Sequence, residues 1–206
     1  MSTVSEISNE APAPLLARSS FSPRRITVVR AVGALVWAAA LILALGNDVP
    51  TTGSDLPVLV AVLLVAYPLI DIAASLSQTA LGKGIVPRIN ATIGAAAVAA
   101  LTIAAFGADA GAALAVFGVW AFASGGIQLG VAVHRRRTEG GAVPMIISGA
   151  LSTIAGITFI ASSRMDDAHL GNLAGYAALG AVLYLLSARR NGGRFSATPP
   201  AERTAY

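Results

Sequence analysis

The chain has 206 residues, of which 55% are hydrophobic and 12% are charged. An ordinary soluble domain carries roughly 25% charged residues, so this chain has too few charges to cover the surface of a soluble fold of its size. The apolar residues are rich in Ala and Gly and poor in aromatics, which is typical of helices that pack closely inside a membrane. The sequence has no Cys, which excludes disulfides and Cys-based metal sites.

Residues 1–27 mix Ser, Pro, Glu and Arg without helical or strand periodicity, and we predict a disordered tail there. Six apolar stretches follow, each of the length of about 17–25 residues that a membrane-spanning helix needs. They cover 28–46, 56–76, 90–107, 111–133, 144–162 and 170–188. A second disordered tail is predicted over 189–206, where glycine and proline pairs break regular structure. The predicted fold class is all-α, a polytopic membrane helix bundle whose single domain covers 28–188.

The positions of Lys and Arg predict the orientation of the spans. All but one of the 14 cationic residues lie in the two tails, at the start of the first span, or in the loops after the second and fourth spans. Arg164 is the exception, and it lies among the acidic residues of the other loops. An even number of spans sorts the charges in this way, with both termini on the cytoplasmic side of the membrane. Orientation explains the basic residues, so the expected partner is the lipid bilayer and no nucleic acid.

The six spans are predicted to form three tandem hairpins of parallel orientation. The odd spans carry a glycine near their start and the even spans an aromatic residue in mid-course. The glycines are Gly33, Gly94 and Gly149, and the aromatics are Tyr67, Trp120 and Tyr176. The second and third hairpins are the most alike, with "TIGAAAVAALTIAAF" beside "ISGALSTIAGITFI".

The stretch "FGVWAFASGGIQLGVAVHRRRTEGGAVPMIISGALSTIAGITFI" combines an aromatic residue, a glycine pair, a Gln and a basic loop with a helix of the form Ser-Gly-x-Leu-x-x-Ile-x-Gly-Ile. This pattern resembles the HdeD family of small bacterial membrane proteins, over roughly residues 30–188. The resemblance implies repeated transmembrane hairpins, a location in the bacterial inner membrane and an association with acid stress. The family has no agreed catalytic residues, so the resemblance implies no active site.

Asp71 is the one acidic residue inside a predicted span. A carboxylate in hydrocarbon costs several kcal/mol and is a functional hypothesis by default. The repeat alignment predicts an intramembrane polar cluster of Asp71, Ser75, Ser124 and Gln128, with the fourth span as the first expected partner of the carboxylate. Lys83 or Arg88 is the second expectation. Two interpretations stay open, a proton- or ion-sensing carboxylate and a group that fixes helix packing.

Two Gly-xxx-Gly pairs allow close helix approach. We expect them to pack helices within the bundle, and homo-oligomerisation is the alternative. They are Gly126 with Gly130, and Gly171 with Gly175. No catalytic motif, metal-ligand spacing or cofactor fingerprint is present, so we expect no enzyme activity, no cofactor and no metal. The predicted function is a non-enzymatic membrane protein acting in acid or envelope stress. The alternative is a small transporter or channel that uses Asp71.

Overall fold

The computed structural model describes residues 23–192 apart from 48, 81, 83 and 137–141, and within this part it contains six helices and no strand. The helices are α1 (Pro23–Leu45), α2 (Val58–Ala80), α3 (Ile85–Gly107), α4 (Ala110–Arg135), α5 (Ala142–Ser162) and α6 (Gly171–Gly192). All six are long and apolar enough to cross a membrane. The predicted all-α membrane bundle is therefore confirmed.

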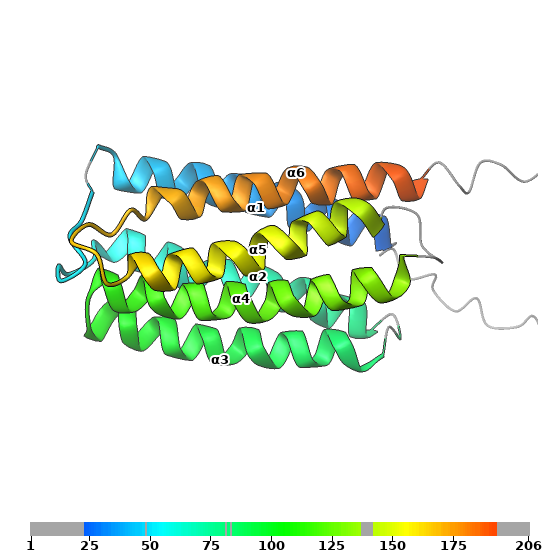
Figure 1. Ribbon diagram of the computed structural model, residues 1–206, viewed down its shortest axis with the longest axis horizontal. Helices are drawn as coiled ribbons and strands as arrows, with labels where there is room; N and C mark the ends of the chain where they lie inside the picture. The colour runs from blue at the N-terminus through cyan, green and yellow to red at the C-terminus, as the bar shows by residue number, and fades with distance from the viewer. Residues whose placement is uncertain (1–22, 48, 81, 83, 137–141, 193–206) are drawn as a thin grey trace, which may run out of the picture.

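Several helices extend beyond the apolar stretches at the end where the termini leave the bundle (Figure 1). α1 begins at Pro23 and α6 continues to Gly192, so both enter segments that the sequence predicted as disordered tails. Proline suits the first turn of a helix because its missing N–H needs no partner there. Basic residues interrupt an apolar stretch but do not terminate a helix. The helices therefore continue beyond the predicted spans. The predicted tail residues 1–22 and 193–206 lie outside the described residues.

The helices form a closed ring in which each helix packs against the next in sequence and α6 packs against α1. The most extensive contacts join α4 to α5, α1 to α6 and α2 to α3, while the contacts within each hairpin are smaller. Successive hairpins thus meet at three seams, of which the one between α4 and α5 is the most extensive. At two of these seams, the two helices approach each other closely at a glycine of the predicted repeat. A Cβ atom on Gly94 would lie 2.6 Å from Ile72 Cγ1, and one on Gly149 would lie 2.6 Å from the Leu129 nitrogen.

Three loops close the end of the bundle opposite the termini (Figure 1). The Thr52 nitrogen donates to the Asp166 carbonyl at 3.0 Å, and the Gly111 nitrogen donates to the Thr52 carbonyl at 2.8 Å. Asp109 caps α4, since its side chain accepts a hydrogen bond of 2.6 Å from the Ala112 nitrogen. The loops between α1 and α2, α3 and α4, and α5 and α6 therefore share one end, as predicted. Their compartment stays a prediction.

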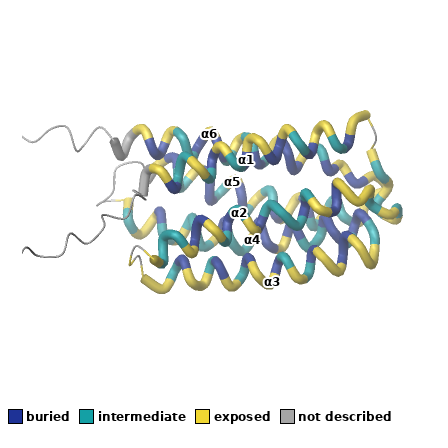
Figure 2. The backbone as a smooth tube through the Cα atoms, turned by 180° about the vertical axis from the view of Figure 1, so that it is seen from behind, coloured by how far each residue is buried: buried dark blue, intermediate teal, exposed yellow. Residues whose placement is uncertain are grey.

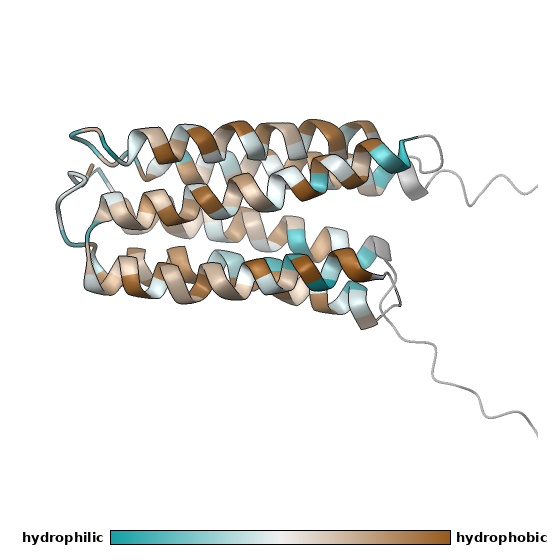
Figure 3. Ribbon diagram, turned by 60° about the horizontal axis from the view of Figure 1, so that its bottom comes forward, coloured by the Kyte–Doolittle hydropathy of each residue, from teal (hydrophilic) through white to brown (hydrophobic). Residues whose placement is uncertain are grey.

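The outer surface of the ring is apolar, and Leu43, Val58 and Ile103 are 82%, 70% and 73% exposed. Buried and exposed positions alternate along the helices (Figure 2), and hydrophilic colours gather in the loops and near the end where the termini leave (Figure 3). A surface of this kind needs a hydrocarbon solvent. The chain is a multi-pass membrane protein.

Candidate functional site

Asp71 lies inside the bundle and is 3% exposed. Its Oδ1 atom forms an ion pair with the Arg30 guanidinium of α1. Its Oδ2 atom accepts a hydrogen bond of 2.6 Å from Asn90 Nδ2 of α3, and the same amide donates to Ser75 Oγ at 3.0 Å. Asp71 and Ser75 are four residues apart and share one face of α2, so a single amide reaches both. Both carboxylate oxygens are satisfied, one by a charge and one by an amide.

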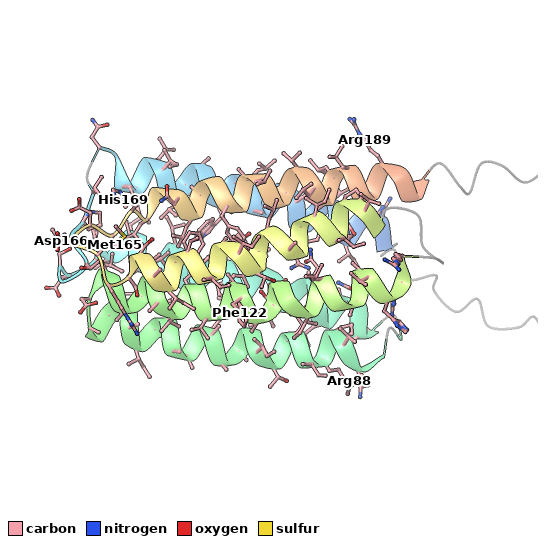
Figure 4. All side chains as sticks on the ribbon, viewed as in Figure 1. Arg88, Phe122, Met165, Asp166, His169 and Arg189 are labelled. Atoms are coloured by element: carbon pink, nitrogen blue, oxygen red, sulfur yellow. The ribbon has the colours of Figure 1, made fainter. Side chains whose placement is uncertain are left out.

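The expected partner of Asp71 on the fourth span is wrong. Ser124 Oγ donates weakly to the Ala121 carbonyl of its own helix, at 3.5 Å, and Gln128 contacts other groups. The reason is the order of the ring, in which α2 packs between α1 and α3 and makes no extensive contact with α4. Arg88, the second expectation, is exposed and points away from the bundle (Figure 4), and Lys83 lies outside the described residues.

Sequence reasoning missed the roles of Arg30 and Asn90. Arg30 was assigned to membrane orientation with the other basic residues. It is, however, the one cationic residue inside the stretch 28–46, and a lone arginine in a span matches a lone carboxylate in the next span. That pairing was the available signal, because intramembrane charges usually pair with one another. Asn90 marked the start of a predicted span and gave no comparable signal.

Arg30 also lies over the aromatic ring of Tyr184 on α6, with Cζ 4.5 Å from the ring centroid, which is cation–π geometry. Tyr184 Oη donates to Gln128 Oε1 at 2.5 Å. Gln128 Nε2 in turn donates to the Met145 carbonyl of α5 at 3.4 Å. We call Arg30, Asp71, Ser75, Asn90, Gln128 and Tyr184 the polar layer. Through it and the Met145 carbonyl, all six helices are connected.

Six aromatic side chains fill the centre of the ring between the polar layer and the three loops that connect α1 to α2, α3 to α4 and α5 to α6. Tyr67 precedes Asp71 by four residues, about one helical turn. The cluster consists of Trp37, Tyr67, Phe117, Trp120, Phe159 and Tyr176. The three aromatics of the predicted repeat all belong to it, and the Tyr67 and Trp120 ring centroids are 5.6 Å apart. The centre of the bundle at this level is packed with rings rather than open.

Hydrogen bonds fasten this aromatic cluster to the helices. Trp37 Nε1 donates to the Leu63 carbonyl at 2.5 Å, and the hydroxyls of Ser152 and Tyr176 are 2.6 Å apart. Trp120 is 4% exposed, and its Nε1 atom has no hydrogen-bond acceptor among the described residues. Trp120 mainly makes edge-to-face contacts with neighbouring aromatic rings.

The glycines predicted to pack helices inside the bundle do not do so. A Cβ atom on Gly126, Gly130 or Gly175 would have no neighbour within 4 Å, and one on Gly171 would meet only Ile42 Cδ1 at 3.9 Å. Close packing occurs instead along the seam between α4 and α5. The glycines of that seam are Gly118, Gly125, Gly149 and Gly156. Position on the helix face, and not the four-residue spacing, decides which glycines meet a neighbour.

Within the described residues, no group of three His, Cys, Asp or Glu side chains is arranged to hold a metal ion. The layer is an electrically balanced pair with amide and hydroxyl partners, and it contains no nucleophile next to a base.

Comparisons of the chain with protein-family models, curated proteins and solved structures find no match. The resemblance to the HdeD family stays a prediction from the sequence. The contacts of the polar layer are therefore the structural basis for a proposed function.

Proposed function

We propose that this chain is a non-enzymatic membrane protein of acid or envelope stress, and that Asp71 is its acid-responsive group. The observation that carries the proposal is the ion pair between Asp71 and Arg30, which is held inside the polar layer. This pair crosses the seam between α1 and α2, where helix contacts are less extensive than at the three main seams. Because the other contacts between α1 and α2 are less extensive, this charge pair can control how the two helices pack against each other.

Acid acts on this pair by protonating the carboxylate. Among the residues that the structure describes, Arg30, Tyr67, Tyr176 and Tyr184 interact electrostatically with Asp71. Arginine and tyrosine keep their charge states throughout the acid range, so Asp71 is the group in this cluster that acid discharges. The stabilisation from the pair is present while Asp71 is ionised and is lost as the pH falls.

The magnitude follows from the burial of the two partners. Removing one partner of a buried ion pair costs about 3–5 kcal/mol because the other charge is left uncompensated. Arg30 keeps 22% of its side chain exposed and stays over the Tyr184 ring. The expected cost of discharging Asp71 is therefore at the lower end, about 3 kcal/mol, which is enough to shift a conformational equilibrium at the α1–α2 seam.

The alternative of a transporter or channel has less support. The charge of Asp71 is neutralised by Arg30. A carboxylate that takes part in transport must instead be able to leave its protein partner and bind the transported species. The aromatic cluster also occupies the centre of the ring next to the polar layer. A path through the centre would require several rings to move together.

The test measures unfolding of the purified protein in lipid nanodiscs between pH 7 and pH 2, because the stabilisation by a carboxylate–arginine pair is lost only below the pKa of a free aspartate, about 3.9. The variants are Asp71→Asn, which removes the titrating group, and Asp55→Asn, which removes an exposed carboxylate in the loop between α1 and α2. Wild type and Asp55→Asn should lose stability together as the pH falls, and Asp71→Asn should change much less. In cells that lack the protein, Asp71→Asn should reach the membrane but fail to restore acid survival. Identical pH profiles for all three proteins would overturn the proposal.

A further inference from the structure

A groove runs along the outer surface between α1 and α6, near the end of the bundle where the termini leave. Its volume is about 320 Å³, and its lining is apolar apart from one arginine. The lining residues are Val28, Val182, Leu185, Leu186, Ala188 and Arg189. Val182 and Leu186 are 48% and 44% exposed, so the groove opens toward the membrane. It is separate from the polar layer, and no step of the proposed function uses it.

Arg189 supplies the charged end of this groove. It belongs to the last turns of α6, is exposed, and points outward from the bundle (Figure 4). At the end of a span, such a side chain extends into the headgroup region of the bilayer. A guanidinium presents several N–H donors in a planar fork that matches the oxygens of a phosphate. The groove and the arginine together thus offer an apolar channel that ends in a phosphate-binding group.

We propose that this groove binds one anionic phospholipid, with an acyl chain along Val182 and Leu186 and the headgroup phosphate on Arg189. The sign of the charge selects the lipid class. Among the described lining residues Arg189 is the one that carries a charge, so this part of the groove presents a cation and no carboxylate to a headgroup. A lipid with net negative charge is therefore favoured over one that carries a compensating cation.

The experiment is native mass spectrometry of the detergent-purified protein with phosphatidylglycerol or phosphatidylcholine added at equal concentration. Wild type should retain one phosphatidylglycerol about fivefold more strongly than phosphatidylcholine, the effect of one arginine at an anionic headgroup. Arg189→Gln should abolish this preference. Arg88→Gln is the matched control, since it removes another exposed arginine, on α3, at the same end of the bundle (Figure 4). It should bind like wild type.

A second variant tests the apolar part of the site. Val182→Phe places a ring in the groove and should reduce retention of both lipids without changing the helical circular dichroism. Equal retention of the two lipids by wild type would overturn the proposal. So would an equal effect of Arg88→Gln and Arg189→Gln, or binding that rises without saturation beyond one lipid. A lipid-free dimer that Val182→Phe dissociates would assign the groove to a second copy of the chain instead.

Discussion

Gly156→Ala tests the close contact between α4 and α5. An added Cβ atom would lie 2.5 Å from the Phe122 nitrogen, 2.6 Å from the Gly118 carbonyl oxygen and 2.8 Å from Phe122 Cα. All three neighbours are backbone atoms of α4, so no side-chain rotation relieves the overlap, and the helices must separate by about 1 Å to restore van der Waals contact. Overpacking of this kind costs about 1–3 kcal/mol, and the better helix propensity of alanine offsets about 1 kcal/mol of it.

Because all three overlaps are with backbone atoms, the overpacking cost lies at the upper end of that range, and the expected net destabilisation of Gly156→Ala is about 2 kcal/mol. Gly126→Ala is the control, because a Cβ atom there meets nothing within 4 Å. It should raise stability by up to about 1 kcal/mol, the gain in helix propensity. Both can be measured by titrating the protein in mild detergent with sodium dodecyl sulfate and following helical circular dichroism. If Gly126→Ala destabilises the protein as much as Gly156→Ala, the assignment of the packing glycines is incorrect.

Three further predictions concern the polar layer and the orientation of the ring. Asp71→Leu should destabilise the protein by about 3 kcal/mol, and adding Arg30→Met should restore much of this loss because the uncompensated charge disappears; a double variant that shows the sum of both single effects would contradict the ion pair. Tyr184→Phe keeps the ring over the guanidinium and loses only the hydrogen bond to α4, so it should cost about 1 kcal/mol, whereas Tyr184→Leu should cost more in the same titration. Cysteines introduced one at a time at Asp166 and Arg189 should react with a membrane-impermeant reagent from opposite sides of intact membranes, and labelling of both from one side would refute the topology.

The sequence was sufficient for the number of helices and for their association with a membrane. Backbone groups in hydrocarbon must be satisfied within the segment, so a long apolar run has no alternative to a helix. The loops at 47–55, 108–110 and 163–169 follow from the breaks between such runs, and they share one end because the spans alternate in direction. These features depend on local composition and length alone.

The partner of Asp71 and the identity of the packing glycines were decided by the tertiary structure. In a soluble helix the polar face marks the outside, but here both the core and the lipid are apolar, so the sequence does not show which face of a span points inward. Gly125 and Gly126 are adjacent, and yet a Cβ on the first would meet Ser152 at 2.6 Å while one on the second would meet nothing. Arg30 reaches Asp71 because the ring places α1 beside α2 with these two faces together. Helix rotation and ring order are set by packing between distant segments, and no local pattern in the chain specifies them.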